Sequence, residues 1–187
     1  MELYIKNMVC NRCKTVVQAE LIKLGLHPIS VQLGRVEISE KTIEPLKYLE
    51  LGQTLQQFGF ELLLDRKKQT VEQIKTAIIE LVHYTTVALK VNLSIYLSEK
   101  LALGYANLSA TFSDMEGVTI ERYFIHQKIE KVKELLTYDE KSLSEIAYLL
   151  DYSSVAHLST QFKKITGETP SSYKLAHFQI RKTIDEV

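Results

Sequence analysis

The sequence predicts an α+β protein in which a small mixed domain is followed by an all-helical domain. Three observations support this fold class. Alternating strand patterns and two helical patterns fill residues 1–66. A pattern with a period of 3.6 residues follows over residues 70–91. A motif then occurs twice at an offset of 50 residues, as when one supersecondary unit is used twice.

The first domain, residues 1–66, is predicted to have the order strand, helix, strand, strand, helix, strand, the split βαβ arrangement. Gly25 and Gly59 are helix stops, and Pro45 suits a first helical position. The second helix is expected to carry Leu46, Leu49, Leu55 and Phe58 as its apolar residues. The strands are expected at 1–8, 29–33, 36–38 and 60–64, and the helices at 13–24 and 45–58.

Residues 67–91 are predicted to link the two domains. The charged run Asp65-Arg66-Lys67-Lys68-Gln69 looks like a break and is the expected boundary. An amphipathic helix of about 22 residues, about 33 Å long, should follow it. Its stripe needs a partner, either the helical domain behind it or the same helix in a second copy of the chain, and both alternatives stay open. The stripe consists of Val71, Ile74, Ala77, Ile78, Leu81, Val82, Ala88 and Leu89.

The helical domain, residues 92–187, contains two helix-turn-helix patterns, at about 92–117 and 142–167. Asn92 and Ser142 are good N-caps at equivalent positions, and Ser142 has Glu145 three residues on, as in a capping box. The second helices are expected at 105–116 and 154–166, and a longer helix at 119–137 lies between the copies. The predicted core includes Leu108, Phe112, Tyr123, Leu158, Phe162 and Tyr173, and Gly117 and Gly167 should end the second helices.

Residues 92–178 resemble the DNA-binding domain of AraC-type transcription regulators. The second copy carries the resemblance best, through Leu143-Ser144-Glu145-Ile146-Ala147, His157-Leu158-Ser159-Thr160-Gln161-Phe162 and Gly167-Glu168-Thr169-Pro170. The resemblance implies a partner, double-stranded DNA, with the second helix of each copy in the major groove. Homodimerisation and contact with RNA polymerase are further expectations. The implied DNA-facing residues are Tyr105, Ala106, Ser109 and Ala110 in the first copy, and Val155, Ala156, His157, Ser159, Thr160 and Lys163 in the second.

Three departures from the family pattern bear on the expected DNA binding, and the last two lower the expected affinity. Asp151 stands in the turn where the family usually has Gly, although Asp tolerates a left-handed backbone. Ala110 and Thr160 stand where the family commonly has Arg. Residues 94–187 hold 11 Lys and Arg against 13 Asp and Glu, whereas phosphate neutralisation normally supplies much of the affinity. Binding should therefore be modest and strongly salt-dependent, or the helices form a scaffold that binds no DNA. The local basic patch would be Lys163, Lys164, Lys174, Arg181 and Lys182.

The two cysteines, Cys10 and Cys13, lie between the first strand and the first helix. A thiolate at a helix N-terminus is stabilised by the helix dipole, and Arg12 and Lys14 add positive charge. Two thiolates can converge on one soft ion: Cu(I) suits two sulfurs, whereas Zn(II) would need further ligands. Thiol redox sensing, or a domain kept only for packing or dimerisation, are the alternatives.

Together with the strand order, Met8-Val9-Cys10-Asn11-Arg12-Cys13 resembles the heavy-metal-associated domain of copper chaperones and metal-transporting ATPases, over residues 1–66. The resemblance implies a ferredoxin-like βαββαβ fold with Cys10 and Cys13 as metal ligands. It also implies a buried Met8 and a Gly59-Phe60 pair near the metal loop. Asn7 stands where that family usually has Gly.

Bulk composition excludes several other classes of protein. Lys and Arg balance Asp and Glu at 23 each, and 45% of residues are hydrophobic, an ordinary soluble composition. No apolar run approaches the ~20 residues that span a bilayer, and no signal peptide begins the chain, so we expect a cytoplasmic protein with no membrane partner. An enzyme is not expected, because no acid-base pair, nucleophile constellation or phosphate loop is present.

The leading hypothesis is a transcription regulator controlled by a soft metal ion bound at Cys10 and Cys13. The alternative is a cytoplasmic metal carrier or thiol redox sensor whose helical domain docks a protein partner. The near-neutral helical domain and the missing arginines favour the carrier slightly.

Overall fold

The computed structural model describes residues 1–85, 91–138 and 141–178 of the chain, and side chains up to residue 176. The described residues divide into two compact units. The first unit contains residues 1–77 and 94–118, and the second contains residues 78–93 and the helices from 119 onward. Within the described ranges, no helix is both long and apolar enough to traverse a bilayer.

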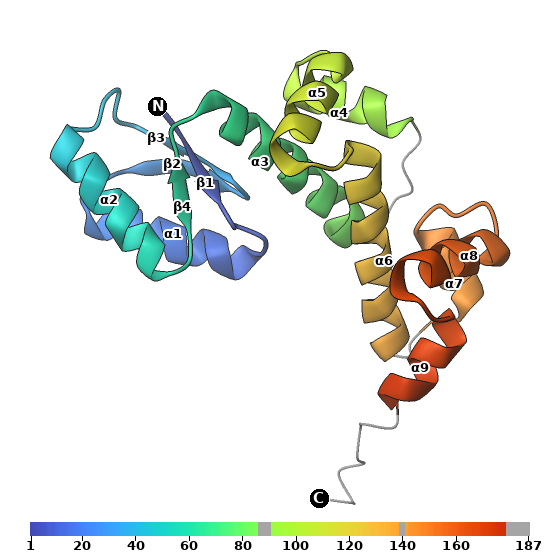
Figure 1. Cartoon of the computed structure of the whole chain (residues 1–187). Coiled ribbons are helices and arrows are strands. Elements are labelled where there is room, and N and C mark those ends of the chain that lie inside the picture. Colours follow the sequence, from blue (N-terminus) through green and yellow to red (C-terminus); the bar gives the residue numbers. More distant parts are fainter. Residues whose placement is uncertain (86–90, 139–140, 179–187) are drawn as a thin grey trace, which may run out of the picture. The chain divides into compact units, whose positions relative to one another are not determined.

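The N-terminal part of the first unit is a four-stranded antiparallel sheet with two helices (Figure 1). The strand order is β2-β3-β1-β4, so β4 is an edge strand. The predicted order of strands and helices is confirmed. The elements are β1 (Glu2–Lys6), α1 (Asn11–Lys23), β2 (Pro28–Gln32), β3 (Arg35–Ile38), α2 (Pro45–Gln57) and β4 (Glu61–Leu63).

Alternation along the strands gives this sheet one apolar face. In β1, Leu3 and Ile5 are buried, and Leu3 pairs with Val36 of β3, which is also buried. Helices α1 and α2 lie against this face and bury residues one turn apart (Figure 1). Each such fully buried side chain contributes about 1.5–3 kcal/mol to folding. The helix residues in this core are Val17, Leu21, Leu51 and Leu55.

The apolar face predicted for α2 is partly wrong. Leu55 is buried, but Leu46 and Leu49 are 80% and 60% exposed, and Phe58 is exposed at the end of the helix. The reason is the helical period: Leu51 and Leu55 are four residues apart and face the sheet, which turns positions 46 and 49 toward solvent.

The predicted charged break at residues 65–69 is also wrong, because these residues begin helix α3 (Arg66–Ile79). The side chain of Asp65 accepts a hydrogen bond from the Lys68 N–H at 2.9 Å, and its carbonyl accepts one from Gln69. Asp65 therefore caps the helix, and the charged residues form its first turn.

The apolar stripe of α3 is buried within the chain over its described length, except at Leu81, which is half-buried. Val71, Ile74, Ala77 and Ile78 are at most 4% exposed, and Val82 lies in a π-helical segment, η1 (Glu80–Tyr84), that continues α3. The remaining stripe positions at 88 and 89 lie outside the described residues. The described part of the stripe therefore packs against other residues of the same chain, as in the first of the two alternatives. Pairing with a second copy of the chain stays a prediction.

Helix α3 also touches two turns of the N-terminal sheet. Glu72 is 8% exposed, and its Oε1 accepts a hydrogen bond from the Asn7 N–H at 3.2 Å. Gly34 has a left-handed backbone (φ 72°), and a Cβ there would lie 2.8 Å from Thr76 Oγ1, so no larger residue fits without displacement. Helix α3 also contacts α5 (Tyr105–Glu116) of the same unit, because Lys75 Nζ lies 2.7 Å from a carboxylate oxygen of Glu116.

The three later helices whose bounds were predicted are close to those bounds. Helix α5 matches its prediction, α8 begins one residue after its predicted start, and α6 extends one residue further. In the second unit, α6 buries Ile129, Val132 and Leu136 against Leu158 and Phe162 of α8. Tyr173 packs edge-on against Phe162 with ring centroids 5.5 Å apart. The helices are α4 (Leu93–Leu101), α6 (Ile120–Tyr138), α7 (Leu143–Leu149), α8 (Val155–Thr166) and α9 (Pro170–Phe178).

Glu72 should make the stability of the protein depend on pH. Burial raises the pKa of Glu72 above its ordinary value, and the hydrogen bond from Asn7 and the charge of Lys75 oppose this only in part. A carboxyl group with a raised pKa in the folded state favours folding most below its ordinary pKa, and this contribution is lost as the pH rises through the folded-state pKa.

We therefore expect Glu72→Gln, which stays neutral and still accepts from Asn7, to be more stable than the parent chain at pH 7.5. At pH 4 the difference should shrink. Urea unfolding at both pH values measures this, with the exposed Glu50→Gln in α2 as control. A Glu72→Gln protein less stable than the parent at pH 7.5 would contradict the expectation.

Candidate nucleic-acid interface and cysteine loop

The second helix-turn-helix is built by α7, a five-residue connection and α8. Ser142 caps α7 in the predicted capping box: its Oγ accepts from the Glu145 N–H at 3.3 Å, and Glu145 accepts from the Ser142 N–H at 2.8 Å. In the connection, Asp151 has a left-handed backbone with φ of 53°. The Tyr152 N–H donates to the Ala147 carbonyl at 2.8 Å and closes the turn. The prediction that Asp151 can replace the family's Gly is confirmed.

Helix α8 has one buried and one open face. Leu158 and Phe162 are fully buried. On the opposite face, Ala156, Thr160 and Lys163 are exposed, at the i, i+4, i+7 spacing that places side chains one above the other. Val155 and Ser159 flank this row and are half-buried. The residues predicted to face DNA in the second copy thus include one continuous solvent-facing row.

His157 is exposed, but it also belongs to the turn. Its Nδ1 lies 3.0 Å from Ser153 Oγ, and its ring meets the Tyr152 ring edge-on at 5.4 Å. Its N–H donates to Ser154 Oγ, the N-cap of α8. Tyr152 is buried and donates its hydroxyl proton to Gln161 Oε1 at 2.7 Å, and burial raises the pKa of Tyr152 to about 12. These bonds fix the start of α8 relative to its turn.

The first copy has the same plan with a different turn. In α5, Leu108 and Phe112 are buried. The left-handed residue of its turn is Ala102 (φ 53°). At the 50-residue offset, Ala102 corresponds to Tyr152 and not to Asp151, so the turn is displaced by one residue. Helix α4 has nine residues where α7 has seven, which accounts for the shift. Of the DNA-facing residues predicted here, Ala106 and Ala110 are exposed and Tyr105 and Ser109 are half-buried.

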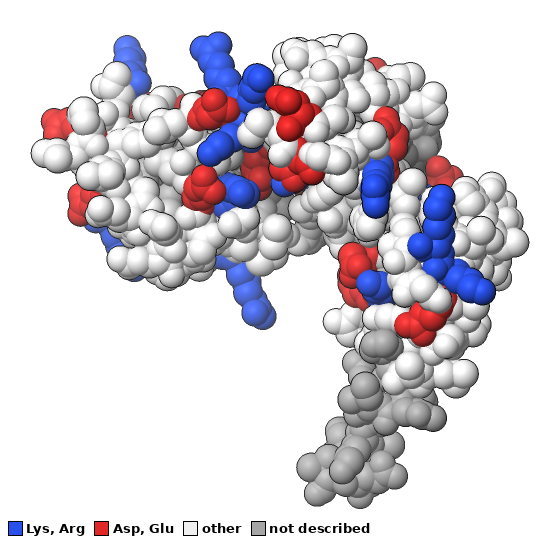
Figure 2. All heavy atoms as spheres, in the orientation of Figure 1, with Lys and Arg blue, Asp and Glu red and all other residues white. Residues whose placement is uncertain are grey.

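Positive charge near the second copy is limited to a few side chains. Lys163 and Lys164 are exposed in the last turn of α8, and Lys174 is half-buried in α9. The other two predicted cations, at positions 181 and 182, lie outside the described residues. On α6, Lys131 pairs with Glu134 at 2.8 Å and Lys133 with Glu130 at 2.7 Å. Figure 2 shows the same interleaving of basic and acidic side chains on the face that it draws.

The cysteine loop connects β1 to α1. Cys10 is the N-cap of α1, and its Sγ lies 3.3 Å from the Sγ of Cys13. Both thiols are free and half-buried. Met8 is 1% exposed, as predicted, and anchors the loop in the core.

Asn7 and the Gly59-Phe60 pair support this loop from the other side. Asn7 takes a left-handed backbone (φ 71°), which explains why Asn replaces a Gly at this position. Its Nδ2 donates to the Gly59 carbonyl at 2.9 Å, and Phe60 is buried next to it in sequence. The Gly-aromatic pair is therefore joined to the β1–α1 loop by a hydrogen bond.

The two sulfurs form a small donor set for a soft ion. With metal–sulfur bonds of about 2.3 Å, both sulfurs can reach one ion, but a near-linear two-coordinate site would require them to move further apart than their present 3.3 Å. Within the described ranges, no three His, Cys, Asp or Glu side chains lie together in a metal-binding arrangement, so a four-ligand zinc site is not supplied there. Two ligands suit Cu(I) better. The backbone N–H and thiol of Cys13, with Arg12, lower the pKa of Cys10, which favours the thiolate that a metal needs.

Comparison with known proteins identifies the helical part of the chain. Residues 97–176 match the model of a helix-turn-helix domain family. The chain is 25% identical over 145 residues to the probable transcriptional regulator LumQ of Photobacterium leiognathi, a match that covers 77% of this chain and 58% of LumQ. The chain therefore spans little more than half of that relative.

Two solved structures share the fold. One is the C-terminal domain of AraT, a response regulator from Geobacillus stearothermophilus, with a TM-score of 0.51 and 24% identity, covering 66% of this chain and 94% of that one. The other is the DNA-binding domain of the transcriptional factor AdpA in complex with a target DNA, with a TM-score of 0.50 and 19% identity, covering 60% and 95%. At these identities the likeness shows the fold of the helical part.

Cys10 should be the more easily alkylated thiol in the metal-free protein. Because the pKa of Cys10 is lowered, its thiolate fraction and its reaction with iodoacetamide should persist to a lower pH than for an ordinary cysteine. Peptide mass mapping after brief alkylation between pH 6 and 9 measures this. Arg12→Ala should move the profile of Cys10 to higher pH, whereas Lys23→Ala, at the far end of α1, should leave it in place. Alkylation of Cys10 with the profile of a free cysteine would contradict this.

Proposed function

We propose that this chain is a cytoplasmic DNA-binding transcription regulator of the AraC type, in which α5 and α8 enter the major groove. One observation carries the proposal: α8 is held by a buried core and a capped turn, and it leaves a row of small and basic side chains open to solvent. A recognition helix needs this combination of rigid support and open face. The family match of residues 97–176 and the fold shared with a domain solved on its target DNA support it.

The open row of α8 suits two kinds of contact with DNA. Thr160 and Ser159 carry hydroxyls that donate to and accept from base edges, and the methyl group of Ala156 fits against a thymine methyl. Lys163 sits one turn further on and suits a phosphate. Since few cations adjoin this row among the described residues, we expect weak binding to non-specific DNA. The dependence of binding on salt should then be shallow, and not strong as the sequence alone led us to expect. The same proposal includes a second copy of the chain and RNA polymerase as partners.

We further propose that the N-terminal domain is a ferredoxin-like, heavy-metal-associated domain that binds Cu(I) at Cys10 and Cys13. Its support is the sheet order, the two neighbouring sulfurs, the buried Met8 and the lowered pKa of Cys10. A bound ion would be held by these two thiolates. Asn7, at the base of the loop, donates its backbone N–H to Glu72 of α3. A change in the conformation of the loop could therefore reach α3, the helix that follows the domain, through this hydrogen bond. Control of DNA binding requires that the ion bind two states of the protein with different affinity.

Substitutions on α8 should separate phosphate contacts from base contacts. Lys163→Ala should weaken binding to selected and unrelated duplexes alike and reduce the salt slope by about 1. Thr160→Arg should strengthen binding, because it restores a cation that the family commonly has there. Fluorescence anisotropy with a duplex from random-oligonucleotide selection measures both effects over a range of salt.

Lys133→Ala, on α6 and paired with Glu130, is the matched control and should bind like the parent chain. Absence of binding to any duplex even at low salt would overturn the proposal. That result would favour the second candidate, a metal carrier or thiol redox sensor whose helical domain docks a protein, which the near-neutral helical domain also suits.

The metal proposal is tested without DNA. Titration of the full chain with Cu(I) under reducing conditions, against a competing chelator, should give one ion per chain. The double variant Cys10→Ser/Cys13→Ser should lose this binding, while Zn(II) should bind far more weakly to both proteins. Equal Cu(I) binding by the parent and the double variant would exclude the cysteine loop as the site.

A further inference from the structure

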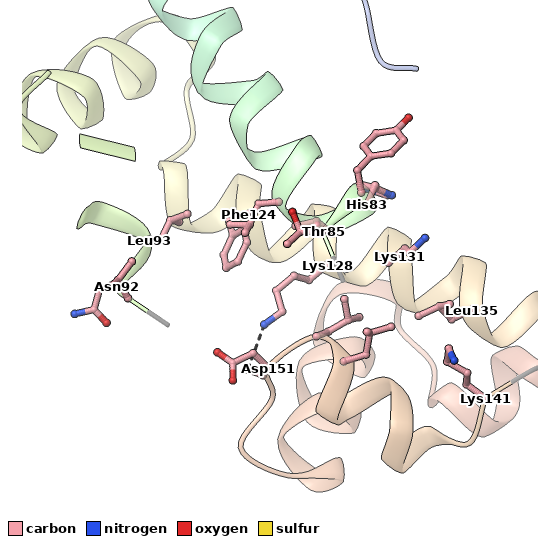
Figure 3. A pocket seen from close by; sticks show the side chains of 16 residues that line it. His83, Thr85, Asn92, Leu93, Phe124, Lys128, Lys131, Leu135, Lys141 and Asp151 are labelled. Carbon is pink, nitrogen blue, oxygen red and sulfur yellow. Dashed lines mark hydrogen bonds between the residues drawn. The ribbon is translucent and has the colours of Figure 1, made fainter. Parts of the chain in front are cut away.

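A cavity of about 540 Å³ lies within the second unit. Its wall is formed by η1, α6 and the connection between α7 and α8 (Figure 3). This volume is within the range of about 300–1,000 Å³ that is usual for small-molecule sites. Neither the fold nor the proposed contacts with DNA and metal require it. The apolar part of the lining is Leu81, Val82, Val91, Leu93, Phe124, Leu135, Leu149 and Leu150.

Lys128 of α6 is the most unusual side chain in this lining. Figure 3 shows it reaching across the cavity toward Asp151. Its Nζ lies 3.5 Å from the carbonyl oxygen of Asp151, a long hydrogen bond, and 4.1 Å and 5.4 Å from the ring centroids of Tyr152 and Phe124. Burial lowers the pKa of Lys128, and Asp151 opposes this only in part. The ammonium group is thus held among rings and one carbonyl, so its solvation by the described residues is incomplete.

Two further lysines and one histidine line the same cavity. Lys131 lies one turn from Lys128 on α6, and Lys141 precedes the cap of α7. Lys131 already pairs with Glu134. His83 enters from η1, with its Nε2 3.2 Å from Gln127 Oε1. Against these groups, Asp151 is the acidic residue of the lining. Glu134, outside the lining, lies 3.8 Å from His83 Nδ1 as well as pairing with Lys131. The lining therefore combines apolar side chains with more lysines than acidic residues, and Lys128 and Lys141 are the lysines that do not face Glu134.

From this lining, we propose that the cavity binds a small organic carboxylate with an apolar body. The carboxylate would sit at Lys128, with Lys131 and Lys141 as the supporting cations. A carboxylate there supplies an anionic partner, which the ammonium group does not have among the described residues beside its long hydrogen bond to the Asp151 carbonyl. A charge-assisted hydrogen bond of this kind is about twice as strong as a neutral one. The apolar body would lie against Phe124 and the leucines and remove their surfaces from water. A ring with a short chain is of suitable size.

The site adjoins the turn that sets α8. Leu150 and Asp151 belong both to the cavity wall and to the connection that starts the proposed recognition helix. An occupied cavity therefore contacts the backbone on which the position of α8 depends. Ligand binding itself does not rest on the proposed contact with DNA, so the two ideas fail separately.

The test uses the full chain without DNA and the probe 3-phenylpropanoate, with its neutral amide, 3-phenylpropanamide, as the matched compound. Calorimetric titration should show the carboxylate binding at least tenfold more tightly than the amide. Lys128→Met keeps the length and apolar stem of the side chain and should lower carboxylate affinity at least tenfold. Lys133→Met, on the same helix but outside the lining, should change nothing.

Lys141→Met is a second variant that leaves the bonds of Lys128 with the turn intact, and it should lower the affinity for the carboxylate by a smaller factor. It keeps the test decisive if Lys128→Met fails to fold. Absence of carboxylate binding overturns the proposal. So does equal affinity for the amide, or equal binding by the lysine variants. Inorganic phosphate binding as tightly as the carboxylate would also overturn it, because the site would then recognise charge without the apolar body.

Discussion

The backbone at Asp151 must take a left-handed conformation so that α7 can stop and α8 can start after a connection of five residues. This conformation costs an ordinary L-residue about 1–2 kcal/mol. The Tyr152 N–H bond to Ala147, the burial of the Tyr152 ring and its hydroxyl bond to Gln161 offset that cost. Lys128 completes the arrangement from α6. The open row of α8, the core beneath it and one wall of the cavity all depend on this single turn.

Most of the fold could be predicted from local patterns in the sequence. Strand alternation, glycine stops and the capping box of Ser142 each reflect interactions within a few residues, and their outcomes agree with the structure. The two wrong predictions concern the apolar face of α2 and the start of α3, where the sequence pattern is compatible with more than one helix face or more than one N-cap. Helix α2 carries leucines on two sides, so the sequence does not indicate which side faces the sheet. Asp65 is followed directly by charged residues, so its role as the N-cap of α3 could not be recognised from the sequence. The one-residue shift of the first turn was invisible because the helices on both sides of the turn begin at the same 50-residue offset in the two copies, and only the end of α4 differs.

The candidate sites could be predicted less completely. The Cys10 and Cys13 pair and the exposed row on α8 were found because their spacing carries the chemistry. The role of His157 in its turn was missed, since it depends on contacts with Ser153 and Tyr152. The cavity lined by Lys128 was missed for the same reason: its residues come from five separated segments of the chain, and none of these segments forms a motif. Asn7 could have been assigned its left-handed backbone from its place where a Gly is usual.

The pairing of lysines with glutamates along α6 has a consequence for how a protein of this kind would find its target. A surface of balanced charge generates little long-range attraction, so the chain would spend little time on the bulk of the chromosome. In a genome with millions of competing sites, occupancy follows the ratio of specific to non-specific binding more than the absolute affinity. A few short-range contacts can then be sufficient, and search would proceed mainly through free diffusion between brief encounters.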